Sequence, residues 1–172
     1  MNIHVDFESF RYLNKILIHL IFKERRYMNK ILGNISFRRE SILKINLNNY
    51  VGHNFPLMYL IWYLENTNLS PEEIYLKKKM FNILQKTNTT FENLYVIGYL
   101  REDNLTLSHE MYHAKFYFDV RYQQEMKKLW KSLNKNKRKE IKTILSNLGY
   151  KKEFYLDEFQ AYLYSDGLFT LD

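Results

Sequence analysis

Hydrophobic and polar positions alternate at two different spacings along this chain, which predicts a mixture of helices and strands. In the first part, apolar residues recur at three- and four-residue intervals, which predicts a helix over residues 7–32 that ends at Gly33. Residues 35–49 show partial two-residue alternation followed by asparagines, so this segment is expected to be extended.

Start and stop signals predict two further helices before residue 90. One covers residues 56–65, with Asn54 as a possible cap. The other opens at Ser70-Pro71-Glu72-Glu73, because Ser70 can cap the first turn and Glu73 can complete a capping box, and it is expected to end near Lys86. The polar stretch 87–90 then divides an N-terminal helical and β segment of unknown role, 1–90, from a second half, 91–172.

The second half begins with a strand and continues as helices. Residues 93–101 are rich in β-branched and aromatic side chains, which is typical of a strand. Helical spacing follows over residues 105–133, 137–148 and 154–164, with Gly149 ending the middle helix. The fold class expected is α+β, with a small, mostly antiparallel sheet over the long helix that starts at residue 105, and with additional helices.

The most informative stretch is His109-Glu110-Met111-Tyr112-His113, which matches the His-Glu-x-x-His pattern. Side chains four positions apart in an α-helix differ by about 40° around the axis, so both imidazoles project from one face and can bind one metal ion. Glu110 lies on the flank, where it can accept a proton from metal-bound water. The small Ala114 would let another helix approach closely. The alternative interpretation is an exposed helix with two incidental histidines.

Two histidines leave a catalytic zinc ion one ligand short, because such sites usually have three protein ligands and a water. The chain contains no cysteine, so the third ligand must be histidine, aspartate or glutamate. Three histidines precede the motif in less suggestive settings: His4, His19 and His53. Downstream, Glu158 and the small Ala161 share a helix face, which favours Glu158 as the ligand and leaves Asp157 as its main competitor. The alternative is an acidic pair that stabilises a helix N-terminus.

These residues resemble the gluzincin metallopeptidases, especially the minimal members called minigluzincins. The resemblance covers roughly residues 93–164 and depends on His109-Glu110-x-x-His113 together with Glu158-x-x-Ala161. It implies a zincin-like fold in which His109, His113 and Glu158 hold Zn²⁺. It also implies an endopeptidase that hydrolyses peptide bonds, with Glu110 as general base and a peptide or protein as substrate.

The resemblance further implies supporting roles around the metal. Leu94–Leu100 looks like the edge strand that pairs with an extended peptide substrate. Tyr162 is the candidate donor to the developing oxyanion, while Tyr155 and Tyr164 are alternatives without a diagnostic motif. Carboxylates that would orient the imidazoles are sought among three residues: Asp119, Asp157 and Asp166. Apart from the resemblance, residues 165–172 lie close to Glu158 in the sequence, so a C-terminal carboxylate at Asp172 could reach the metal and make the enzyme latent.

Charge adds a second hypothesis from another class of protein. The net charge is +7, with dense basic runs at Lys77–Lys79 and Lys135–Lys139, although no nucleic-acid motif accompanies them. The alternative is therefore a catalytically inactive zincin-like module whose basic surface binds a nucleic acid or an acidic protein. No apolar run is long enough to span a membrane and no signal-peptide pattern is present, so the expected location is cytoplasmic or exported by another route. The pattern does not predict an oligomeric state.

Overall fold

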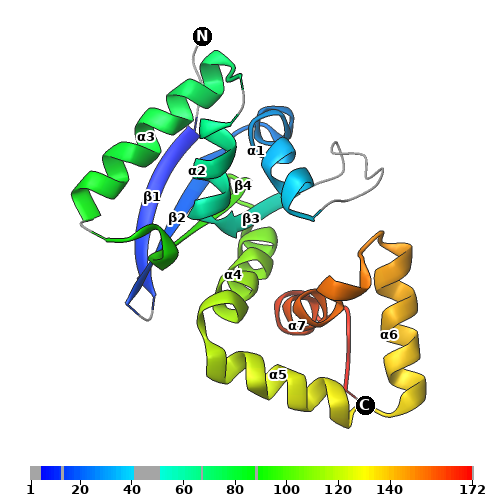
Figure 1. The fold of residues 1–172 in the computed structure, drawn as a ribbon. Coiled ribbons are helices and arrows are strands. Elements are labelled where there is room, and N and C mark those ends of the chain that lie inside the picture. Colours follow the sequence, from blue (N-terminus) through cyan, green and yellow to red (C-terminus); the bar gives the residue numbers. More distant parts are fainter. Residues whose placement is uncertain (1–4, 13, 41–50, 67, 88, 172) are drawn as a thin grey trace. The chain divides into compact units, whose positions relative to one another are not determined.

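The computed structural model describes residues 5–12, 14–40, 51–66, 68–87 and 89–171. Over these residues the chain is α+β, with seven α-helices and one four-stranded sheet (Figure 1). Apart from the segment around residues 41–50, the chain divides into two compact units between Asp103 and Asn104.

The first unit is built on a mixed sheet with the strand order β1-β2-β4-β3. β1 and β2 form an antiparallel hairpin, β2 and β4 are parallel, and β3 and β4 are antiparallel. The sheet is therefore small, as expected, but mixed. The strands are β1 Val5–Tyr12, β2 Lys15–Phe22, β3 Gly52–Pro56 and β4 Leu94–Leu100.

The helix expected over residues 7–32 is wrong. This segment forms the β1–β2 hairpin, with Asn14 at a positive φ of 63° in the turn, and then the start of helix α1, Arg25–Glu40. β2 pairs on both sides, and most of its residues are buried, so it reads as a nearly continuous apolar run. Such a run also satisfies helical spacing, which is why periodicity alone misassigned it. The extended segment expected over 35–49 is helical up to residue 40, and its remainder lies outside the described residues.

The expectation that Leu94–Leu100 is an edge strand is also wrong. β4 pairs with β2 on one side and with β3 on the other, so its backbone groups already bond within the sheet. A peptide substrate therefore cannot pair with β4. Residues 91–103, which include β4, belong to the first compact unit, so the boundary between the units along the chain falls after Asp103 and not at residue 90.

The helices expected between residues 56 and 87 are confirmed as α2, Leu57–Glu65, and α3, Pro71–Thr87. The capping box of α3 is present, since the Glu73 N–H donates to Ser70 Oγ over 3.3 Å and the Ser70 N–H donates to Glu73 Oε2 over 2.8 Å. Asn54 does not cap α2; it lies in β3 and accepts a hydrogen bond from Tyr95. A short 3₁₀ turn, Phe91–Asn93, leads into β4.

The second unit is helical in the described residues. The single helix expected over 105–133 is divided at Asp119, whose side chain accepts the Tyr122 N–H over 3.0 Å and so caps a new helix. α4 and α7 pack against each other, and both Ala114 on α4 and Ala161 on α7 are fully buried (Figure 1). The elements are α4 Asn104–Phe118, α5 Val120–Ser132, α6 Lys135–Asn147, a 3₁₀ turn Lys152–Phe154, and α7 Tyr155–Ser165. None of the helices described is both long and apolar enough to cross a membrane.

A buried histidine makes the first unit sensitive to acid. His53 lies in β3 at 2% exposure, its Nε2–H donates to Asn29 Oδ1 over 2.8 Å, and burial lowers its pKa to about 3. The folded state thus binds fewer protons than the unfolded state, so stability present above pH 6.5 is lost as the pH falls towards 3. At pH 5 this residue should lower the free energy of unfolding by about 2 kcal/mol relative to its value at neutral pH.

Hydrogen exchange of the β4 amides at pH 7 and pH 5 measures this loss. His53→Gln keeps an amide N–H donor without a titrating ring, so its β4 amides should lose less protection than those of the parent chain. An equal pH dependence in the two proteins would contradict this assignment.

Candidate metal centre

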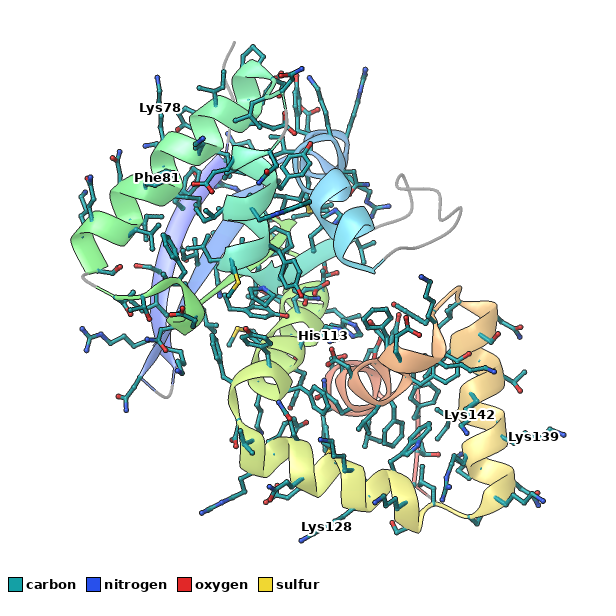
Figure 2. The ribbon with its side chains drawn as sticks, viewed as in Figure 1. Lys78, Phe81, His113, Lys128, Lys139 and Lys142 are labelled. Carbon is teal, nitrogen blue, oxygen red and sulfur yellow. The ribbon has the colours of Figure 1, made fainter. Side chains whose placement is uncertain are left out.

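His113 on α4, labelled in Figure 2, points towards α7, where it contacts Asp157. His109, one turn earlier on α4, contacts Ser165 at the end of α7. The two histidines are four residues apart, and their Nε2 atoms are separated by 3.1 Å. His113 is buried at 3% exposure, and the His109 side chain is only 14% exposed. The helix therefore presents two imidazole nitrogens at one protected point.

Glu158 on α7 brings a carboxylate to the same point. Its Oε2 lies 3.6 Å from His109 Nε2 and 3.7 Å from His113 Nε2, and donor atoms of the three residues all lie within 4.8 Å of one another. This oxygen is buried and has no hydrogen-bond partner within the described part of the chain. A buried carboxylate oxygen without a partner is costly, so it requires a cation or a proton nearby.

The three donor atoms fit a small metal ion. A triangle with the separations above has its equidistant point about 2.0 Å from each atom, and zinc binds histidine nitrogen and carboxylate oxygen at about 2.0–2.2 Å. Two imidazoles and one carboxylate are also a donor set of catalytic metal sites. The cluster of His109, His113 and Glu158 could therefore hold a metal ion.

Hydrogen bonds from the far side of each ring fix the orientation of the imidazoles. His113 Nδ1–H donates to Asp157 Oδ1 over 2.8 Å. His109 Nδ1 lies 3.2 Å from Ser165 Oγ, which itself donates to Asp166 Oδ1 over 3.1 Å. With each Nδ1 occupied by an oxygen, each Nε2 is left to face Glu158.

This arrangement separates the acidic residues by role. Asp157 contacts a ring from behind and is not one of the three clustered donors, so Glu158 is the better ligand candidate. Asp166 reaches His109 only through Ser165. Asp119 caps α5 instead. The proposed latent arrangement with Asp172 falls on a residue outside the described part.

The electrostatic field of the cluster favours positive charge. Burial disfavours the charged form of His113, but the carboxylates of Asp157, Glu158 and Glu110 outweigh it and raise the pKa of His113 to about 10. A group of acidic side chains that holds a proton this tightly would also attract a metal cation. Glu110 itself is buried at 6% exposure, one position after His109.

Two tyrosines lie beside the cluster. The Tyr162 ring centroid is 4.4 Å from that of His109, and the Tyr162 hydroxyl is 3.1 Å from the hydroxyl of Tyr150. Burial raises the pKa of Tyr162 to about 12 and the pKa of Tyr150 well above its ordinary value, so both hydroxyls keep their protons. The two other tyrosines considered as oxyanion donors have different contacts: Tyr155 packs in the core of the second unit, and Tyr164 stacks on Tyr112. Tyr150 carries no sequence signal and was missed.

Gln160 was also missed, although a polar residue in a buried helical stretch could have revealed it. It is fully buried, and its Nε2 donates to Asp157 Oδ1 over 3.1 Å and to the Tyr112 carbonyl over 3.2 Å. Its Oε1 accepts the Tyr122 hydroxyl proton over 2.9 Å. Gln160 therefore links α4, α5 and α7 behind the carboxylate that orients His113.

Comparison of this chain with known proteins found no matching family model, no matching curated protein and no matching solved structure. The resemblance of the sequence to gluzincins therefore remains an expectation. Any function assigned to the chain depends on the geometry of the cluster itself.

Replacing Gln160 should destabilise the second unit while leaving the three candidate metal ligands unchanged. Gln160→Leu leaves the Tyr122 hydroxyl and the Tyr112 carbonyl buried without this partner, and should lower the free energy of unfolding by about 2–3 kcal/mol. Urea unfolding followed by Trp130 fluorescence in a Trp62→Phe background measures this change.

The matched control is Gln124→Leu at an exposed position of α5, which should change the stability by less than about 0.5 kcal/mol. Tyr122→Phe should lower the free energy of unfolding less in the Gln160→Leu background than in the parent chain. The reason is that Gln160→Leu has already removed the Gln160 oxygen that accepts the Tyr122 hydroxyl. Equal costs would show that Gln160 and Tyr122 are not coupled.

Proposed function

We propose that this chain is a zinc-dependent metalloendopeptidase in which His109, His113 and Glu158 hold the metal. The observation that carries the proposal is the buried Oε2 of Glu158, which has no hydrogen-bond partner in the described residues and faces the Nε2 atoms of both histidines. Bound zinc would supply Lewis-acid polarisation of a peptide carbonyl and acidification of a water molecule.

The remaining steps belong to side chains around the cluster. Glu110 is buried beside His109, and its charge contributes to the raised pKa of His113, so its carboxylate lies within electrostatic reach of the cluster. In the proposal it accepts the proton of the attacking water and passes it to the leaving amine. Tyr162 keeps its hydroxyl proton and donates it as a hydrogen bond to the carbonyl oxygen of the substrate.

Zinc content and the Glu110→Gln variant test this assignment directly. The purified protein should contain about one zinc ion per chain, because the residues that the structure describes contain one cluster of three donors. Glu110→Gln should retain the zinc and lose peptide cleavage, since it removes the proton acceptor but none of the three donors. Metal analysis and digestion of a peptide library, with and without chelator, measure both.

The outcomes distinguish the two hypotheses from the sequence. A Glu110→Gln protein that cleaves as fast as the parent contradicts the mechanism. A parent chain that binds zinc but cleaves nothing supports the alternative of an inactive module.

Metal affinity should also respond to Asp157 and Glu158 in a graded way. Asp157→Asn removes the carboxylate that accepts His113 Nδ1–H and should weaken zinc binding about 10–100-fold. Glu158→Ala removes a ligand and should weaken zinc binding further. Glu153→Gln, an exposed acidic position shortly before α7, is the control and should leave the affinity unchanged. Competition with a zinc-binding dye measures all three, and equal affinities for Glu158→Ala and the parent would exclude Glu158 as a ligand.

The tyrosine pair gives a test of the oxyanion donor. Tyr162→Phe should lower kcat by about 10²–10³-fold with little change in zinc affinity, because the ring that packs on His109 is kept and only the hydroxyl is lost. Tyr150→Phe should have a smaller effect, since its hydroxyl acts only through that of Tyr162. Steady-state kinetics decide, and an unchanged kcat in Tyr162→Phe would remove this residue from the mechanism.

A further inference from the structure

A groove with a volume of about 610 Å³ opens on the second unit, lined by α5, α6 and the start of α7. One wall is a stripe of polar residues on α6 at helical spacing, and the facing wall comes from the 3₁₀ turn and the first residues of α7. Leu156 in this wall directly precedes the Asp157-Glu158 pair, so the groove and the metal centre share the first turns of α7.

The rim of the groove is basic. Lys139 and Lys142 come from α6, where Figure 2 labels them, and Lys152 comes from the 3₁₀ turn. All three lysines are exposed, and none forms an ion pair within the described residues, whereas the neighbouring Lys137 pairs with Glu140. The one acidic residue in the lining is Glu153. An excess of uncompensated positive charge around a concave surface selects for a negatively charged occupant.

The less exposed part of the lining, called the floor of the groove below, is apolar. It consists of Trp130, Tyr155 and Leu156, and Trp130 packs on Phe159 at 5.1 Å between ring centroids. Polar side chains of α6 along the wall, Thr143, Ser146 and Asn147, add hydrogen-bonding groups. An occupant therefore needs acidic groups for the rim together with apolar side chains for the floor.

We propose that this groove binds an acidic polypeptide segment that carries interspersed apolar side chains, independently of the metal centre. A nucleic acid fits less well, because its bases need exposed rings for stacking. Here Tyr155 is 8% exposed and Trp130 packs on Phe159. Of the basic runs noted in the sequence, only Lys139 lines this groove; Lys142 and Lys152 lie outside those runs.

Trp130 allows binding to be observed directly. The chain has two tryptophans, and Trp62 lies at an exposed position of α2 in the first unit, so Trp62→Phe leaves Trp130 as the single reporter. A short peptide that alternates glutamate and leucine should change the Trp130 fluorescence of the full chain in a saturable manner. The affinity should fall as salt is added, because the rim charges are exposed to solvent.

Charge reversal tests the location of the site. Lys139→Glu, Lys142→Glu and Lys152→Glu together should weaken binding by about tenfold or more. The control reverses three exposed lysines of the first unit, Lys23, Lys78 and Lys86, with the same change in net charge, and should weaken binding far less. If the reversed groove variant fails to fold by circular dichroism, neutral Lys→Gln variants at the same three positions replace it.

Three results would overturn the proposal. The first is no saturable response to the acidic peptide. The second is an equal loss of affinity in the groove and control variants, which would show attraction by net charge alone. The third is a response to a single-stranded oligothymidine but not to the peptide, which would reassign the groove to nucleic acid.

Discussion

The second unit is organised around a carboxylate oxygen that is buried between two imidazoles. An isolated charge at such depth costs several kcal/mol, so the surrounding residues must compensate for it. Asp157 and Ser165 turn the rings so that their Nε2 atoms face Glu158, and Gln160 in turn holds Asp157. The helices α4, α5 and α7 are thereby linked by polar contacts that have one common centre.

The need to bring side chains of α4 and α7 to one buried point explains why some residues around Glu158 are small and others are polar. Ala114 and Ala161 are fully buried where α4 and α7 pack together, and a close approach of the two helices is needed for side chains on both to share one point. Gln160 is the opposite case, because it places an amide where an apolar residue would pack more simply. Its amide donates to Asp157 Oδ1, the oxygen that accepts His113 Nδ1–H, so this buried polar residue supports the orientation of His113.

The local features of the site were accessible from sequence, because they depend on helical spacing. The closeness of His109 to His113, the grouping of Glu158 with them and the capping box at Ser70 each follow from residues three or four positions apart, or from a strong local motif. Tyr150 could not be found in this way, since its contact with Tyr162 depends on how a loop folds back onto α7.

The errors in the fold have a common origin in long-range pairing. β2 reads as a helix because a strand buried on both faces loses its alternation, and only its pairing with β1 and β4 decides the outcome. β4 was correctly read as a strand, but its interior position depends on β3, which is far away in the sequence. The break at Asp119 was missed because an aspartate is acceptable within a helix as well as at its cap.

X-ray absorption at the zinc edge of the zinc-loaded chain measures directly whether His109 and His113 coordinate one metal ion. We expect a first shell of nitrogen and oxygen atoms at about 2.0–2.2 Å with the multiple-scattering signature of two imidazoles. The imidazole signature should disappear when both His109 and His113 are replaced. A shell that lacks imidazole scattering in the parent chain, or one that is unchanged in the double replacement, would show that His109 and His113 do not hold the metal.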